Sequence, residues 1–254
     1  MLQAQVAPKF DSYRGKYKHI AMRREDGILE MRLHTDDGPL IWGSLVHEEL
    51  GYCFADVATD RENKVAIIVG TGDVFCTEFD GKSFGEVGTG TFDLIYSDAK
   101  RLLTSLLSIE IPIIGAVNGP AHMHAEIPVL SDIVIASERS SFQDSGHFLA
   151  GRVPGDGVQI VWPALLGPNR GRYFLLTGQI LDAKQAQDLG IVGEVVPHDR
   201  LLTRAWEVAR EIAARPPLAR RYARILLTHE LKRLFHENLG FGLAHAVFSA
   251  LDRF

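Results

Sequence analysis

The spacing of apolar residues along the chain predicts alternating strands and helices. Residues 19–23 and 28–33 alternate between apolar and polar positions around Glu25-Asp-Gly27, a pattern that predicts a β-hairpin. Apolar residues then recur at spacings of four, four and three from Val46 to Val57, as on one face of a helix. The short apolar run 65–69 that follows is typical of a buried strand. The first 70 residues therefore predict the order β, β, α, β.

The same pattern continues through the next 130 residues. A helix is expected around residues 95–106, followed by strands at 113–117 and 133–136. A capped helix follows Asp182 and ends at Gly190, and a last strand covers 191–196. Because helices separate successive strands, the strands are expected to pair in parallel through crossovers. The fold class predicted from this pattern is α/β.

Strand signals vanish after Pro197, which places a boundary near residue 200. Residues 1–200 are expected to form the core and residues 201–254 a helical region, interrupted at Pro216-Pro217 and at Gly240-Phe-Gly242. The helical region carries an apolar stripe, expected to pack inward, and a basic face. The stripe is Leu218, Tyr222, Ile225, Leu226 and Leu234; the basic residues are Arg215, Arg220, Arg221, Arg224, Lys232 and Arg233.

Composition narrows the class of protein. With 46% hydrophobic and 23% charged residues, the chain can bury a large core. The net charge of −5 favours reading the basic face as a solvated surface, so nucleic acid is not an expected partner. No apolar run approaches the roughly 20 residues of a membrane helix, and residues 1–17 are mostly polar, so no membrane partner and no secretion are expected. The two cysteines, Cys53 and Cys76, fit a reducing cytoplasm.

Three polar segments, 72–80, 118–126 and 142–157, follow expected strands, and open parallel sheets bind ligands at such carboxyl ends. His147 in the third segment is a candidate base, because an unperturbed imidazole titrates near neutral pH. Asp156, nine residues later, could orient the second ring nitrogen of that histidine. The alternatives are a structural role for His147 and capping of the following helix by Asp156.

Four other side chains give weaker predictions of a functional role: His122, His124, Cys76 and Trp42. His122 and His124 could form a metal pair, but no third ligand lies at metal spacing, so no metal is expected. Cys76 has no neighbouring base, which predicts a buried neutral thiol. Trp42 could serve the site or simply fill the core.

Several motifs follow one another in a fixed order over nearly the whole chain. They are Phe75-Cys-x-x-x-Asp, Ala116-Val-Asn-Gly-Pro-Ala, Ser131-Asp-Ile-Val-Ile-Ala-Ser, Phe142-x(10)-Val-Pro-Gly-x-Gly and Leu175-Leu-Thr-Gly-Gln-Ile-Leu-Asp-Ala-Lys-Gln-Ala. In this order they resemble the crotonase (enoyl-CoA hydratase/isomerase) superfamily. The resemblance implies a spiral of ββα turns followed by C-terminal helices that pack in trimers, often paired as hexamers.

Departures from the hydratase pattern point to a subgroup. The two glutamates of a hydratase fall on Ile127 and His147, which argues against hydration of an enoyl thioester. His124, His147 and Asp156 instead resemble β-diketone hydrolases such as 6-oxocamphor hydrolase. Further matching segments are Trp42-x-Ser, Tyr52-Cys-Phe, His124-x-Glu-Ile-Pro-Val, Phe142-Gln-Asp-x-x-His-Phe, Val161-Trp-Pro and Asn169-Arg-Gly-Arg-Tyr-Phe-Leu-Leu-Thr-Gly.

This resemblance implies retro-Claisen cleavage of a carbon–carbon bond in a cyclic, non-enolised 1,3-diketone, with water as the only cosubstrate and no cofactor. It makes His147 the base and Asp156 its support, with His124 and the indole N–H of Trp42 as donors to the oxyanion or enolate. The backbone N–H groups of Thr77 and His124 stand where the family binds the substrate oxygen. The expected assembly is a homotrimer or a dimer of trimers.

One position departs from that subgroup. Ala246 occupies the place of a glutamate that supports the loop histidine in 6-oxocamphor hydrolase. Without a carboxylate beside it, His124 is expected to have a lower pKa and to act as a neutral donor, unless Glu126 or another residue substitutes.

Two other classes of function stay open from the sequence. One is a hydratase, isomerase or hydrolase of CoA thioesters, which most of the superfamily favours. The other is an inactive crotonase-fold binding protein, for example one that holds RNA on the basic C-terminal helices.

Overall fold

The structure, a computed structural model, describes residues 6–86 and 88–250 and has a six-stranded main sheet. The strands lie in the order β1-β2-β4-β6-β7-β10. β1 and β2 pair antiparallel, which confirms the predicted hairpin, and all other neighbours pair in parallel. The bounds are β1 Ile20–Glu25, β2 Ile28–Leu33, β4 Val65–Val69, β6 Ile113–Val117, β7 Ile133–Ser137 and β10 Glu194–Val196.

A second set of short strands positions the candidate site. β3 (Leu40–Trp42) pairs in parallel with β5 (Cys76–Phe79), and β8 (Ser141–Phe142) pairs antiparallel with β9 (Leu181–Asp182). Ala121 bridges Cys76 on one side and Phe142 on the other, so the two pairs join into one ladder. The ladder brings together the three polar segments that follow the main strands.

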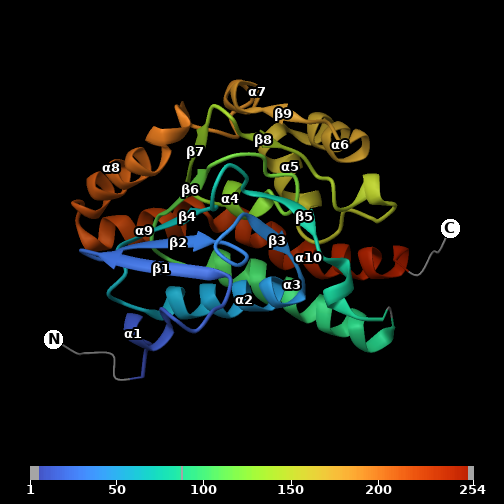
Figure 1. Ribbon diagram of the computed structural model, residues 1–254, viewed down its shortest axis with the longest axis horizontal. Helices are drawn as coiled ribbons and strands as arrows, with labels where there is room; N and C mark the ends of the chain where they lie inside the picture. The colour runs from blue at the N-terminus through green and yellow to red at the C-terminus, as the bar shows by residue number, and fades with distance from the viewer. Residues whose placement is uncertain (1–5, 87, 251–254) are drawn as a thin grey trace.

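Helices cover both faces of the main sheet (Figure 1). Ala66 and Ile68 of β4 face the cluster that includes α2 (Ser44–Thr59) and α3 (Thr89–Ser108). Val65, Ile67 and Val69 face α8 (Leu201–Ala213) on the opposite side. All five side chains of β4 are buried, which explains its uninterrupted apolar sequence.

The remaining elements are short, apart from the last helices. Asp182 caps α7 through a reciprocal hydrogen bond with Gln185, as predicted. β10 is shorter than the expected strand 191–196, because the N–H groups of Ile191 and Val192 donate to Ala186 at the end of α7. The bounds are α1 Phe10–Tyr13, η1 Gly81–Phe84, α4 Glu126–Val129, η2 Phe148–Ala150, α5 Val158–Leu166, α6 Pro168–Thr177, α7 Ala183–Asp188 and η3 His198–Arg200.

The C-terminal region is helical, as predicted. The interruption expected at Pro216-Pro217 is confirmed, because α9 (Pro217–Leu227) begins there. The interruption expected at Gly240-Phe-Gly242 is wrong, because α10 (His229–Ser249) runs through both glycines. A Cβ on Gly242 would lie 2.4 Å from the Gly155 carbonyl oxygen, so this glycine permits close packing against the loop before α5.

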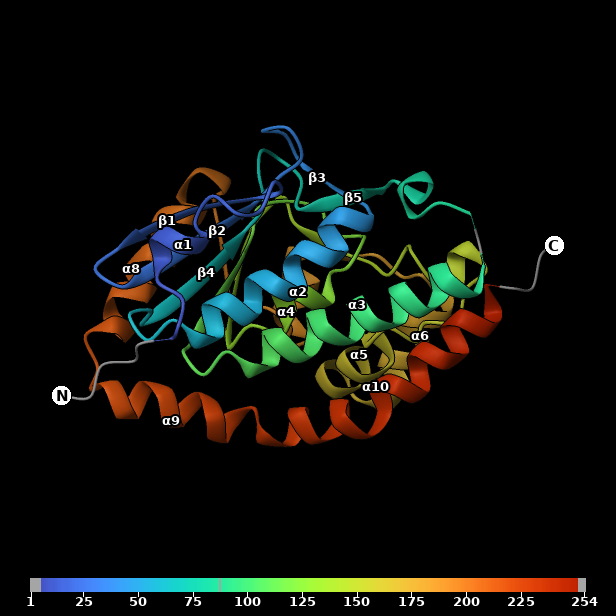
Figure 2. The same ribbon diagram turned by 90° about the horizontal axis from the view of Figure 1, so that it is seen from below.

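Three of the five residues of the predicted apolar stripe do not pack inward in the single chain, although Leu234 on α10 packs against the core. Leu218, Tyr222 and Leu226 are between 58% and 77% exposed, whereas the guanidinium of Arg224 is buried and pairs with Asp132. Arg221 pairs with Glu110. Ion pairs thus neutralise part of the basic face that could have held RNA. Figure 2 shows α9 and α10 along one side of the molecule.

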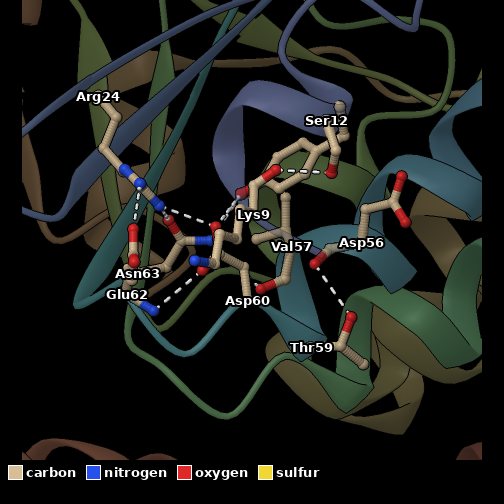
Figure 3. A network of polar contacts seen from close by, with 10 residues as sticks. Lys9, Ser12, Arg24, Asp56, Val57, Thr59, Asp60, Glu62 and Asn63 are labelled. Carbon is tan, nitrogen blue, oxygen red and sulfur yellow. Dashed lines mark hydrogen bonds and ion pairs between the residues drawn. The ribbon is translucent and has the colours of Figure 1, made fainter. Parts of the chain in front are cut away.

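A buried polar network fixes the N-terminal segment to the sheet and α2. Tyr13 Oη donates to Asp60 at 2.8 Å, and Arg24 donates to Asp60 at 2.8 Å and to Glu62 at 2.6 Å. Figure 3 shows these partners around Arg24. The network lies away from the cavity described next and carries no residue that lines it.

No helix in the described part of the chain is long and apolar enough to cross a membrane.

Candidate active site

A cavity of about 210 Å³ lies between the small ladder, α3 and α10. The amino end of α3 and the carboxyl end of α10, which meet at one end of the molecule, contribute much of its wall (Figure 2). Phe84, Phe92, Ile95, Leu243 and Val247 make that wall largely apolar. Polar and aromatic groups from other elements complete the lining, among them Trp42, His47, His124, His147 and Asp156.

His147 lies between two carboxylates. Its Nδ1 is 2.7 Å from Asp144 Oδ1, and its Nε2 is 2.9 Å from Asp156 Oδ2. The predicted contact with Asp156 is confirmed in geometry, but Asp144 occupies the orienting position at the second nitrogen. Asp156 makes no side-chain capping bond to α5, so the capping alternative is not what the structure shows.

The two carboxylates set the charge of His147. Burial alone would lower the pKa of this histidine, but the charges and hydrogen bonds of Asp156 and Asp144 raise it well above the usual range. Burial would raise the pKa of Asp156, yet His147 and then His124 hold that pKa well below its usual range. The two carboxylates therefore favour the imidazolium form of His147, whereas a near-neutral base is expected from the sequence.

His124 has a carboxylate partner despite Ala246. Its Nδ1 is 2.7 Å from Glu126 Oε1, and the nearly fully buried Glu126 begins α4. Burial would lower the pKa of His124, but Glu126 and Asp156 raise it above its usual value. Glu126 thus substitutes for the missing glutamate, which is the alternative that the sequence left open, and the lowered pKa expected without a carboxylate does not apply.

The backbone and ring of His124 are held in an uncommon arrangement. Its φ of 52° lies in the left-handed region, where non-glycine residues are uncommon, and its ring stacks on Trp42 with centroids 3.7 Å apart. Its Nε2 and its backbone N–H have no hydrogen-bond partner within the described residues. Both groups are thus available to a ligand oxygen.

Trp42 and His47 extend the polar end of the cavity. Both side chains are buried, and their rings meet edge to face at 5.8 Å. Burial, followed by the nearby charge of His124, lowers the pKa of His47 to about 3, so its ring is neutral at ordinary pH. Neither side chain has a hydrogen-bond partner in the described ranges, so each offers a nitrogen to a ligand.

Thr77 is less closely placed than the other expected residues. It lies on β5 at the register shift opposite Leu40 and Ile41, and it is not among the residues that line the cavity. Of the residues predicted for the site, the cavity brings together Trp42, His124, His147 and Asp156.

A third potential metal ligand appears only in three dimensions. Side-chain atoms of His124, Glu126 and Asp156 lie within 4.8 Å of one another. The sequence offered no such set beside His122 and His124, because Asp156 lies on a later loop, far from His124 and Glu126 along the chain. The same atoms already pair with each other and with His147, and a cation would have to displace the proton of His124.

The structure supports a non-catalytic role for the two cysteines and for His122. Cys53 and Cys76 are free and buried, and burial raises the pKa of Cys76 to about 12, which confirms a neutral thiol. His122 accepts or donates one hydrogen bond at Ser141 Oγ, 2.8 Å away, and does not line the cavity.

Three residues of the site received no clear role from the sequence: Asp144, Glu126 and His47. The i, i+3 spacing of Asp144 and His147 was a usable signal, because one turn of loop can bring such side chains together. Glu126 was only a possible substitute, and no sequence signal distinguished His47 from the apolar face of its helix.

The known proteins to which this chain is similar share its fold, but their names give different reactions. The enoyl-CoA hydratase/isomerase family matches residues 23–245, and the chain belongs to this family. An enoyl-CoA hydratase/isomerase structure from Mycobacterium paratuberculosis, 24% identical, covers 93% of this chain and 95% of that one with a TM-score of 0.87. The crotonase fold is thereby confirmed.

A second solved structure is more similar in sequence. It is a β-diketone hydrolase from the cyanobacterium Anabaena sp. PCC 7120 bound to (S)-3-oxocyclohexyl acetic acid, with 44% identity, 98% of each chain covered and a TM-score of 0.92. Among curated relatives, the carnitinyl-CoA dehydratase of Proteus mirabilis is 32% identical over 79% of this chain and 76% of that protein. The enoyl-CoA isomerase/hydratase fer4 of Mycosarcoma maydis is 29% identical over 65% of this chain and 61% of its own length.

Proposed function

We propose that this protein hydrolyses a carbon–carbon bond of a cyclic, non-enolised 1,3-diketone to give a keto acid. The observation that carries the proposal is the array Asp144–His147–Asp156, which lies beside His124 at the polar end of a largely apolar cavity. The ring centroids of the two histidines are 6.3 Å apart, so both can reach one small ligand. The similarity to a β-diketone hydrolase at 44% identity supports the same reaction.

The array supplies a base that can remove a proton from water. Asp144 fixes Nδ1–H of His147, so Nε2 is the nitrogen that faces the cavity. A water that binds between Nε2 and Asp156 replaces their direct contact. Neutral His147 takes one proton from this water as its oxygen bonds to a substrate carbonyl carbon. Because the carboxylates favour the charged form of His147, catalysis is expected to increase as pH rises through its pKa.

Groups beside the array supply donors for the developing charge. The attacked carbonyl oxygen becomes an oxyanion, and collapse of this intermediate breaks the bond to the carbon between the two carbonyl groups. That carbon leaves as an enolate, whose oxygen can accept from His124 Nε2–H, the indole N–H of Trp42 or the ring of His47. His147 then returns its proton to the enolate carbon, and diketone plus water have become keto acid.

The ligand of the Anabaena hydrolase suggests a substrate shape for this chain. An acetic acid group on the third carbon of a cyclohexanone is what water addition and ring opening give from a bridged bicyclic 1,3-diketone. A compact, apolar diketone of that kind suits a cavity of about 210 Å³ with mainly aromatic and aliphatic walls. The bridged ring also keeps the diketone non-enolised, as the reaction requires.

A CoA-thioester reaction is the second candidate, favoured by the names of the curated relatives. The site favours it less, because the buried side chain of Ile127 stands at one of the two hydratase glutamate positions and His147 at the other. A thermal shift with CoA distinguishes the two candidates, since only a CoA enzyme is stabilised by this ligand.

The test is an assay of cyclic 2,2-disubstituted and bridged 1,3-diketones in CoA-free buffer, followed by chiral chromatography of the keto acids. Turnover is expected for the wild type, and His147→Ala should lower kcat by about 10² to 10⁴-fold. Turnover restricted to crotonyl-type thioesters would contradict the proposal.

A further inference from the structure

One cationic side chain lies on an otherwise neutral part of the cavity wall. Arg152 is the only lysine or arginine among the described residues that line the cavity. It follows η2 on the loop that carries His147, and its backbone N–H donates to the carbonyl oxygen of His147 at 2.9 Å. The position of Arg152 is therefore linked directly to the residue proposed as the base.

Two contacts hold this loop and the guanidinium in place. The guanidinium carbon lies 5.3 Å from the ring centroid of Phe79, and Phe79 stacks on Phe84 with centroids 5.6 Å apart. The next residue, Val153, donates from its N–H to Ser249 Oγ of α10 at 2.9 Å. Arg152 is exposed to solvent, and its guanidinium lies over the Phe79 ring at the edge of the cavity.

The charge around Arg152 is unbalanced. No carboxylate pairs with it within residues 6–86 and 88–250, unlike the arginines at positions 24, 204, 221 and 233. At the polar end of the cavity, three carboxylates, Asp144, Asp156 and Glu126, accompany only two titrating imidazoles, His124 and His147. Burial raises the pKa of Glu126, so this carboxylate is the most easily neutralised of the three, but the two imidazoles are already matched by Asp144 and Asp156 and leave no cation free for a further anion.

Hydrolysis of a diketone creates a new anion in this environment. The neutral substrate and water become a carboxylic acid, which ionises, next to the carboxylates that activated the water. Repulsion between like charges disfavours the product carboxylate at the polar end. Arg152 is the cation of the cavity wall that can receive it.

We propose that Arg152 forms an anion subsite that binds the carboxylate of the keto acid product; this inference rests on the proposed function and adds a recognition element to it. The subsite binds product more tightly than the neutral diketone from which the product forms. It also predicts the substrate class beyond simple diketones: a diketone that already bears a carboxylate can bind at Arg152 before reaction.

The experiment measures binding of 3-oxocyclohexyl acetic acid and of its methyl ester by calorimetry or ligand-observed NMR. The variants are Arg152→Gln, Arg152→Lys and the control Arg139→Gln, which removes an equal charge from an exposed pair with Asp73. We expect Arg152→Gln to weaken the acid about 5- to 20-fold and the ester by less than about twofold, since the pair is partly exposed. Arg152→Lys should retain part of the affinity, and Arg139→Gln should retain all of it.

Binding and turnover are measured separately, so the Arg152 subsite and the proposed diketone hydrolysis can be contradicted independently. If the acid binds in an Arg152-dependent manner but no diketone is hydrolysed, the subsite stands and the proposed function is wrong. If the acid and ester weaken equally in Arg152→Gln, or the wild type does not bind the acid, the subsite is overturned even where diketones turn over. Arg152-dependent binding of CoA without binding of the keto acid also overturns it.

Discussion

Asp144 is the residue whose role in the site can be tested most sharply. Asp144→Asn keeps the shape of the side chain and removes the charge that holds His147 Nδ1. Because that charge raises the pKa of His147, the variant should lower this pKa. The acidic limb of kcat should then move to lower pH, while the plateau falls by about 10-fold or more as the ring loses its orientation. A pH–rate profile measures both effects.

The control for Asp144→Asn is Asp73→Asn, an exposed aspartate away from the cavity, which should leave the profile unchanged. A fall in kcat with no shift of the limb would mean that Asp144 only supports the fold. In the His147→Ala background, adding Asp144→Asn should change kcat little, because the two residues act as one unit.

Glu126 gives a second prediction at the scale of single residues. Glu126→Gln should lower the pKa of His124, since Glu126 is the main group that raises it. His124 would then lose its proton at lower pH, and any basic limb of kcat that depends on imidazolium should shift the same way. Position 246 lies on the α10 wall of the same cavity, so adding Ala246→Glu should raise the pKa of His124 part of the way back. Imidazole titration by NMR follows both variants. A titration that Ala246→Glu leaves untouched would show that position 246 does not act on His124.

The sequence identified residue types more readily than their pairing. His147, Asp156, His124 and Trp42 were predicted for the site and line one cavity. Their partners were harder to assign, because an acid–base pair depends on distances of about 3 Å that spacing along a loop does not fix. Glu126 therefore became the partner of His124 only in three dimensions.

Among the elements, α10 carries a glycine whose substitution should have an unusual sign. Alanine normally stabilises a helix interior relative to glycine by about 1 kcal/mol. At Gly242, however, a Cβ would lie 2.0 Å from Gln159 Nε2 and 2.4 Å from Gly155 O. Gly242→Ala should therefore lower the melting temperature and reduce kcat, because α10 must move away from the loop that holds Asp156.

The matched control is Gly240→Ala, two residues earlier on the same helix. The nearest atom to a Cβ there is the hydroxyl of Tyr96 at 3.0 Å, the end of a side chain that can shift. This variant should retain the activity and melting temperature of the wild type or exceed them slightly. Equal losses in both variants would contradict the close-packing explanation.

Elements with strong periodicity were predicted well, and those set by distant contacts were not. The hairpin at β1 and β2, the buried β4 and the capped α7 follow from local patterns. The strands β3, β5, β8 and β9 are two to four residues long and pair only with remote segments, so no local pattern marks them. The local sequence around Gly242 predicts a helix break, but this glycine is needed for the close packing of an unbroken helix.

For the whole molecule, the expected oligomer stays a prediction, as does a cytoplasmic location. The exposed apolar face of α9, formed by Leu218, Tyr222, Leu226 and Leu227, is the surface we expect a second copy of the chain to cover. Tyr222→Lys with Leu226→Lys should convert the expected trimer or hexamer to smaller species, as measured by light scattering. A wild-type monomer at micromolar concentration would contradict the expectation.

The division of the cavity wall has a consequence for how this enzyme could change. The reacting groups come from loops and short strands of the first 156 residues, whereas Leu243, Ala246, Val247 and Ala250 of the C-terminal end shape much of the opposite wall. Apolar substitutions at Leu243, Val247 and Ala250 can therefore reshape the chamber for a different ring while the acid–base groups stay as they are, whereas a carboxylate at position 246 is expected to act on His124. Directed evolution restricted to these three positions should yield variants with altered enantiomer preference and an unaltered reaction, a separation of chemistry from selectivity that few-residue libraries can exploit.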